Sequence, residues 1–222
     1  MIKKVVAFGT HPDDIELGCG GALALLIARG AEVVHVCLTS GESGSQTVSP
    51  AALKLIREKE AKAAAAALGS KAVRFLGFPD GLLHVTREMK LPLMEIIRRE
   101  KPDTNFTHSR TDEFPDHKVA CELILSAILA ASGPWYQEVT LPPHQTTHIY
   151  GYEVWHPIAE PQMMVDITSV LDKKRAAVNC FKSQLADVSY DDAWEGLARY
   201  RGALSRVGEC AEAFEVIRQG LG

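Results

Sequence analysis

The chain has 222 residues, of which 46% are hydrophobic and 23% are charged, and its formal net charge is −4 with an isoelectric point near 6.1. This composition is typical of a folded domain with a sizeable core, and its mild acidity argues against a nucleic-acid-binding or anionic-membrane-binding surface. The sequence has no apolar run long enough to span a bilayer, no signal-peptide core and no Cys-x-x-Cys pair among its five cysteines, which together favour the reducing cytoplasm.

The first predicted strand, residues 5–8, leads into a polar loop that carries candidate metal ligands. His11 and Asp14 are three residues apart, so one helical turn would place both side chains on the same side while Asp13 points elsewhere. Imidazole and carboxylate groups are common zinc ligands, and a catalytic zinc site usually has three protein ligands and a water. The loop therefore predicts a metal site that still needs one ligand. The alternative is that one of the two aspartates only caps the following helix.

That helix is predicted over 22–28 and is followed by a strand over 32–39, which is apolar on both faces as expected for a covered parallel strand. Glu42 lies in the polar loop that follows, where a solvated glutamate is the simplest interpretation. A long helix is predicted over 51–68, with Ser49 and Pro50 at its start and Gly69 at its end.

Arg57 and Glu60 lie one turn apart on this long helix, and an intrahelical ion pair is their simplest interpretation. A short strand over 72–76 follows, and then Asp80 precedes a glycine, as an ordinary turn residue does. A helix over 91–99, opened by Pro92, and a strand over 103–107 complete four cycles of strand, polar loop and helix. This alternation predicts a parallel α/β sheet with helices on both faces.

The segment Phe-Pro-Asp-His at 114–117 lies between the strand over 103–107 and a predicted helix over 119–130. Ligands bind at the carboxyl ends of the strands in open α/β sheets, so this segment and the first loop are expected to converge. His117 is therefore the candidate third ligand, beside His11 and Asp14. Asp13 would then lie next to a metal-bound water, where a carboxylate can act as general base.

The rest of the chain begins with an irregular stretch over 132–147, predicted to be a loop or lid at the mouth of the site, or else a plain surface connection or subunit contact. Two strands are predicted over 148–154 and 163–167. Thr168 is expected to cap a helix that runs to about residue 180, and residues 190–200 begin a last helical region, followed by a tail broken up by glycines. No repeat or linker divides the chain, which predicts a single domain over 1–222.

Three motifs resemble the PIG-L/LmbE family of zinc-dependent N-deacetylases: His-Pro-Asp-Asp at 11–14, Gly-Gly at 20–21 and Pro-Asp-His at 115–117. Further segments follow in the family's order, so that the resemblance covers nearly the whole chain. They are Leu-Thr-Ser-Gly-Glu at 38–42, Leu-Gly at 68–69, Pro-Asp-Gly at 79–81, Val-Asp-Ile-Thr at 165–168, Lys-Ser-Gln-Leu at 182–185, Tyr-Arg-Gly at 200–202 and Ala-Glu-Ala-Phe at 211–214.

The resemblance implies a Rossmann-like, mostly parallel sheet flanked by helices. It implies a hydrolase that removes an acetyl or similar acyl group from an N-acetylated sugar, such as an N-acetylglucosamine conjugate, with zinc or another divalent transition metal as cofactor. It also implies a substrate-binding role for Glu42, Arg57 and Asp80. Family members often assemble, so a homo-oligomer is expected. A nucleotide-dependent enzyme is disfavoured, because the segment 18–21 lacks the Gly-x-Gly-x-x-Gly fingerprint.

Phe114 departs from the family, since many members have a histidine here that is thought to stabilise the oxyanion or protonate the leaving amine. A phenyl ring can do neither, although a metal ion supplies part of the stabilisation as a Lewis acid. His156 is the candidate substitute, with His108, His144 and His148 as alternatives. The alternative function is a metal-binding relative whose deacetylase activity is altered or lost.

Overall fold

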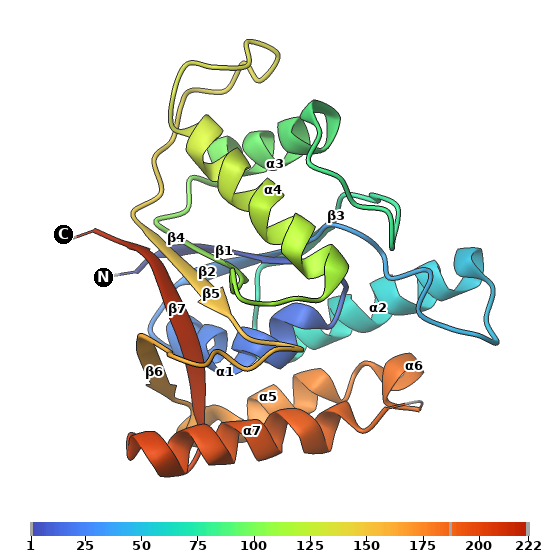
Figure 1. Ribbon diagram of the computed structural model, residues 1–222, viewed down its shortest axis with the longest axis vertical. Helices are drawn as coiled ribbons and strands as arrows, with labels where there is room; N and C mark the ends of the chain where they lie inside the picture. The colour runs from blue at the N-terminus through green and yellow to red at the C-terminus, as the bar shows by residue number, and fades with distance from the viewer. Residues whose placement is uncertain (1, 187, 221–222) are drawn as a thin grey trace.

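The computed structural model describes residues 2–186 and 188–220, which contain a seven-stranded sheet of order β3-β2-β1-β4-β5-β7-β6 (Figure 1). The strands are β1 (Lys4–Gly9), β2 (Glu32–Cys37), β3 (Ala72–Phe75), β4 (Thr104–His108), β5 (His148–Tyr152), β6 (Met163–Asp166) and β7 (Ala211–Gln219). The helices are α1 (Asp14–Ala28), α2 (Pro50–Leu68), α3 (Arg87–Glu100), α4 (Pro115–Ala131), α5 (Leu171–Val178), α6 (Lys182–Leu185) and α7 (Tyr190–Ser205), with a 3₁₀ turn, η1 (Thr168–Val170), before α5. None of the helices in the two described ranges has the length and hydropathy needed to traverse a lipid bilayer.

The sheet is mostly parallel, as the alternation of strands and helices predicts. Strands β1 to β5 are paired in parallel, and β7 lies antiparallel between β5 and β6. The carboxyl ends of β1 and β4 are therefore neighbours at one edge of the sheet. The loops that begin at Thr10 and Ser109 leave from this edge, which is how the sheet brings the two predicted ligand segments together.

Helices cover both faces of the sheet, with α3 and α4 on one face and α1, α2, α5 and α7 on the other (Figure 1). The alternation of side chains along β1 explains the two layers. Val6 and Phe8 are buried in a core with α3 and α4, whereas Val5 and Ala7 are buried in a second core with α1. Apolar side chains on both faces of β1 thus fix its central place in the sheet.

Several helix starts differ from the sequence-based predictions: α1 begins at Asp14 and α4 at Pro115, each earlier than predicted, and two further starts differ because of local hydrogen bonds. Helix α3 begins at Arg87, because Thr86 caps it by accepting a hydrogen bond from the backbone N–H of Met89, so Pro92 lies inside the helix and does not open it. Thr168 begins a 3₁₀ turn and does not cap a helix. Its hydroxyl oxygen instead accepts hydrogen bonds from the backbone N–H groups of Glu209 and Cys210, which ties the turn to the segment before β7.

The stretch 132–147 lies at the opposite edge of the sheet from the predicted ligands, so the prediction of a lid at the site is wrong. It connects the end of α4 to the start of β5, and Thr147 and His148 donate backbone hydrogen bonds to the carbonyl of Asp103, just before β4. Arg98, which is buried, holds the stretch by donating to backbone carbonyls that include those of Gly133 and Val139. This stretch is therefore a structural connection.

A buried ion pair between Lys174 and Glu212 is inserted beside helix α1. The Glu212 carboxylate accepts the backbone N–H groups of Gly21 and Ala22 at 2.7 Å each, and the Lys174 ammonium donates to the carbonyl of Leu17 at 2.7 Å. In a regular α-helix the N–H of Gly21 would bond to that carbonyl. The Lys174 ammonium and the Glu212 carboxylate are 2.7 Å apart. Glu212 thus takes the place of the Leu17 carbonyl as acceptor for Gly21, and Lys174 takes the place of the Gly21 N–H as donor to Leu17.

Candidate active site

Three predicted ligands, His11, Asp14 and His117, face one another at the carboxyl edge of the sheet. His11 lies in the turn after β1, Asp14 begins α1, and His117 lies in the first turn of α4. The Nδ1 atom of His11 is 3.3 Å from Nε2 of His117, and the Asp14 carboxylate oxygens are 3.5 Å from the former and 3.3 Å from the latter. Their ligand atoms all lie within 4.8 Å of one another, as a shared ion requires.

Each of the two imidazoles also has a carboxylate at the ring nitrogen that points away from this cluster. Asp80 Oδ1 is 3.1 Å from Nε2 of His11, and Asp112 Oδ2 is 3.0 Å from Nδ1 of His117. Such a carboxylate fixes the tautomer and orientation of a ligating histidine and raises its basicity. Both rings thus have the second-nitrogen carboxylate partner that metal-binding histidines usually have.

The carboxylates create a strong preference for positive charge at both rings. Burial alone would lower the pKa of His11, but hydrogen bonds and charge interactions with Asp14 and Asp80 outweigh it and raise the pKa to about 10. Burial likewise opposes charge on His117, yet Asp14 and Asp112 raise its pKa to about 9. A metal ion can take the place of the protons held there, and a set of two imidazoles and one carboxylate suits a divalent transition metal.

His108 supports the cluster from behind and does not reach the pocket. Its ring is fully buried and stacks on that of His117 with 3.9 Å between centroids, and its Nε2 is 3.3 Å from Asp14 Oδ2. Burial and the neighbouring His117 lower the pKa of His108 to about 4, so this ring is neutral at pH 7. The other two alternatives, His144 and His148, lie at the opposite edge of the sheet, where His144 contacts the carbonyl of Pro102.

Asp13 lies beside the cluster and is held by Arg57. Its Oδ1 accepts a hydrogen bond from Arg57 Nη2 at 2.8 Å, and Arg57 also donates to the carbonyl of Gly41 at 3.0 Å. Although Asp13 occupies the N-cap position of α1, its side chain makes no capping hydrogen bond. The capping alternative therefore does not describe Asp13. Arg57 is also not paired with Glu60, which accepts hydrogen bonds from Ser183 instead.

Of the two remaining residues predicted to contact substrate, Asp80 lines the pocket and Glu42 is not among the described residues that line it. The Oδ2 atom of Asp80 accepts the backbone N–H of Ser43 at 2.8 Å. The Glu42 carboxylate accepts the backbone N–H groups of Asp80 and Ser40, at 3.1 and 3.3 Å, and so joins two loops of the site.

The pocket has a volume of about 460 Å³ and a lining of two chemically different kinds. The polar part carries three groups able to bind hydroxyls, on Ser43, Asp80 and Gln184, in addition to Asp13 and Arg57. Much of the remaining lining is apolar and is formed by Leu17, Phe114, Val154, Trp155 and the ring of Tyr190. A pocket with both hydroxyl-binding and apolar lining suits a sugar, which has polar edges and apolar faces.

Comparison with known proteins gives the family. The family model of PIG-L, described as GlcNAc-PI de-N-acetylase, matches residues 6–128. The chain belongs to this family. The diacetylchitobiose deacetylase of Thermococcus kodakarensis is 32% identical over 87% of this chain and 73% of its own length. The predicted family and α/β fold are thereby confirmed.

Two solved structures of the family share the fold over almost the whole chain. The N,N'-diacetylchitobiose deacetylase from Pyrococcus horikoshii has a TM-score of 0.87 and 27% identity, covering 97% of this chain and 84% of its own. The 4-carboxy-2-hydroxymuconate hydratase from Pseudomonas putida has a TM-score of 0.88 and 27% identity, covering 100% and 98%. Proteins with this fold therefore catalyse more than one reaction, and the residues of the site must be used to distinguish between these reactions.

Phe114 occupies the position at which this chain departs from the family motif. Its ring lies 5.9 Å from that of His11 and 4.8 Å from that of His117, and it stacks on Trp155 at 5.8 Å. It therefore places an apolar ring directly over the proposed ligands. The structure thus has an aromatic ring at the position where the resemblance implied an imidazole.

His156, the predicted substitute, contacts Asp112, the carboxylate that also contacts His117. It is not among the described residues that line the pocket. Its Nδ1 is 3.1 Å from Asp112 Oδ1 and 3.2 Å from the backbone nitrogen of Glu113. The side chain is 48% exposed. His156 and His117 thus both lie within 3.1 Å of the Asp112 carboxylate. Direct action on a substrate by the His156 ring remains a prediction.

Sequence reasoning missed two aspartates of the site. Asp112 is fully buried and accepts the backbone N–H of Phe114 in addition to its two histidine contacts. Asp116 lines the pocket, and its Oδ2 accepts the backbone N–H of Gly81 at 2.8 Å. Asp116 lies within the segment Phe-Pro-Asp-His and Asp112 lies two residues before it, which was the available signal, because loops at a strand end carry functional groups.

Replacing Asp112 by asparagine is expected to weaken metal affinity by a factor of about 10–100, because His117 would lose the partner that orients it. Burial opposes charge on this carboxyl, but hydrogen bonds from His117 and the N–H of Phe114 lower its pKa to about 2. Competition with a chromogenic chelator measures the affinity. Asp172→Asn, at an exposed carboxylate of α5, is the matched control and should bind metal normally. Unchanged affinity in Asp112→Asn would contradict the orienting role.

Proposed function

We propose that this chain hydrolyses the acetyl amide of an N-acetylated amino sugar joined to a second group. The proposed cofactor is a divalent transition metal, zinc in the first place, held by His11, Asp14 and His117. The observation that supports it is the convergence of these three ligand groups beside a second carboxylate, Asp13, in a pocket whose lining includes hydroxyl-binding groups. Family membership and the deacetylase relatives support the same reaction.

The bound ion, Asp13 and Arg57 each have a separate role in the proposed reaction. When bound, the ion would polarise the amide carbonyl and lower the pKa of a water. Asp13 accepts a proton from the attacking water, and the same carboxyl returns it to the departing nitrogen as the carbon–nitrogen bond breaks. The hydrogen bond from Arg57 fixes the orientation of the Asp13 carboxylate, which supports this role. The products are acetate and a free amino sugar.

The charges of the pocket argue against the hydratase reaction of the Pseudomonas putida relative, whose named substrate carries a carboxylate. Four carboxylates line this pocket, those of Asp13, Asp14, Asp80 and Asp116. Arg57 is the one guanidinium among the described lining residues, and it is already paired with Asp13. Even with a divalent ion, an anionic substrate would meet an excess of negative charge. An N-acetylated sugar is neutral and meets no such cost.

The experiment that tests the proposal is metal analysis together with acetate release from methyl glycosides of N-acetylglucosamine. Purified protein should contain about one equivalent of a divalent transition metal, lost in His11→Ala. The loaded protein should release acetate, and the metal-free protein should not. Absence of metal uptake would overturn the metal site, and metal binding without acetate release would favour the non-deacetylating alternative. In that case Phe114→His should restore release if the missing imidazole is the cause.

Three further expectations stay predictions beside this function. They are a single domain over residues 1–222, a homo-oligomeric assembly and a cytoplasmic location.

A further inference from the structure

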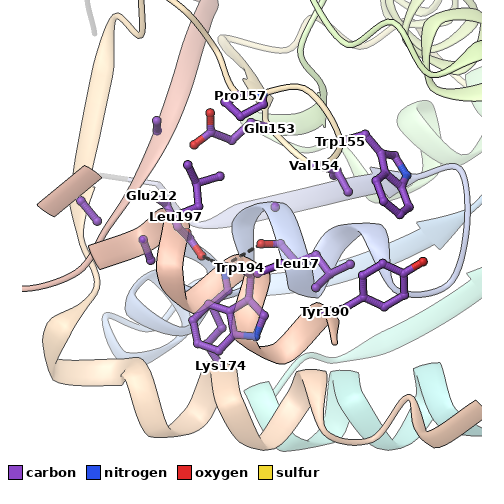
Figure 2. A pocket seen from close by; sticks show the side chains of 15 residues that line it. Leu17, Glu153, Val154, Trp155, Pro157, Lys174, Tyr190, Trp194, Leu197 and Glu212 are labelled. Atoms are coloured by element: carbon purple, nitrogen blue, oxygen red, sulfur yellow. Dashed lines mark hydrogen bonds and ion pairs between the residues drawn. The ribbon is translucent and has the colours of Figure 1, made fainter. Parts of the chain in front are cut away.

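A second cavity, of about 280 Å³, adjoins the pocket at its apolar residues (Figure 2). Figure 2 shows Leu17, Val154, Trp155 and Tyr190 on one side of it and Leu197 on the other. These first four residues also line the metal pocket, so the two cavities share part of their lining. A molecule bound beside the ligand histidines therefore lies next to this second cavity.

Aromatic rings lead from the metal cluster to this cavity. Phe114 touches both ligand histidines, stacks on Trp155 at 5.8 Å, and Trp155 meets Tyr190 edge-to-face at 5.4 Å. Trp155 is 44% exposed, so part of its ring is open to a bound molecule. Aromatic faces of this kind bind apolar rings and the apolar faces of sugars.

The floor of the cavity carries charges that are already neutralised. Lys174 and Glu212 line it, but they are buried, they pair with each other, and their other contacts are to backbone groups of α1. The ring of Trp194 covers the Lys174 ammonium at 4.8 Å. The rest of the lining includes Pro157 and Leu197. Glu153, the other charged residue of the lining, is paired with Arg201. Among the described lining residues the cavity thus offers apolar contacts and no unpaired charge, which suits an uncharged, apolar occupant.

We propose that this cavity binds an apolar, ring-shaped group attached to the anomeric carbon of the amino sugar. This inference rests on the proposed function, because that function places the acetamide at the metal cluster. In the substrate named for the diacetylchitobiose deacetylases, an acetylated amino sugar is joined to a second ring. In this proposal the sugar hydroxyls contact Ser43 and Asp80, and the second ring lies beside Phe114 and Trp155, where the pocket and the cavity share lining residues. The aromatic row thus makes this chain selective for an apolar second group.

The test compares phenyl and methyl β-glycosides of N-acetylglucosamine as substrates in wild type and Ala193→Phe. Ala193 lines the cavity on an exposed face of α7, so a phenyl side chain there fills the cavity without disturbing the core. Wild type should prefer the phenyl glycoside by about tenfold or more, mainly through KM, because a ring is buried. Ala193→Phe should lose this preference and keep the wild-type rate on the methyl glycoside.

Leu204→Phe, which adds the same ring to an exposed position of α7 outside the cavity, is the matched control and should behave as wild type. Equal rates of wild type on both glycosides, or a preference that survives in Ala193→Phe, would overturn the proposal. An N-hexanoyl substrate tests the acyl side: if Ala193→Phe abolishes only a preference for the longer acyl chain, the cavity binds that chain and the proposal is wrong.

Calorimetric binding of the corresponding glucosamine glycosides, which have no acetyl group to lose, separates this proposal from the proposed function. Tighter binding of the phenyl compound to wild type, lost in Ala193→Phe, would support the cavity even if no acetate is released from any substrate. Equal binding of the phenyl and methyl compounds would overturn it even if the protein is an active deacetylase.

Discussion

Replacing Asp13 by asparagine is expected to lower kcat by a factor of about 10²–10⁴ while the metal content stays near one ion per chain. The asparagine amide cannot accept the proton that the Asp13 carboxylate takes from water, but the asparagine side chain has almost the same shape as the aspartate side chain. Asp13 is separate from the three converging ligand groups, so metal binding should persist. Acetate release and metal analysis on the same preparation give both quantities.

Asp14→Ala is the matched control, because it removes the neighbouring carboxylate, which lies within 3.5 Å of both ligand histidines. This variant should lose both the metal and the activity. Full activity in Asp13→Asn would show that another group acts as base. Loss of metal in Asp13→Asn would mean that Asp13 is itself needed for the ion, and its assignment as base would then be unsupported.

The fold and the three converging side chains could be predicted because their signals are local. An apolar strand followed by a polar loop and a helix is visible in the sequence, and the parallel sheet brings successive strand ends to one edge. His11 and Asp14 are on one turn, and His117 is at a second strand end, so their convergence follows from topology alone. The structure brings these three together as the sequence predicted.

The supporting contacts could not be predicted, since they depend on how loops from different strands pack. Asp80 reads as a turn residue in sequence, yet its carboxylate lies 3.1 Å from His11. Arg57 reads as half of a helical ion pair, yet it holds Asp13. Strand β7 was missed because its buried glutamates, Glu212 and Glu215, interrupt the apolar pattern that marks a central strand. Their partners lie far away in the sequence.

Replacing Glu212 by alanine is expected to reduce the free energy of unfolding by about 3–5 kcal/mol, because it leaves the Lys174 ammonium buried without its partner. Both side chains are at most 4% exposed, so water cannot substitute for the lost carboxylate. The N–H groups of Gly21 and Ala22 would also lose their acceptor, which adds to the cost. Urea denaturation of the metal-loaded protein measures the change.

The double variant Glu212→Leu with Lys174→Met distinguishes loss of the ion pair from loss of the α1 contacts. If the unpaired ammonium is the main cost, removing both charges should recover most of the stability, as apolar replacements of buried pairs often do. If the backbone groups of Leu17, Gly21 and Ala22 are the main cost, the double variant should be as unstable as Glu212→Ala. Glu32→Ala, which breaks an exposed ion pair with Lys71, should leave the unfolding midpoint nearly unchanged. An equally small effect in Glu212→Ala would show that α1 does not depend on the buried pair.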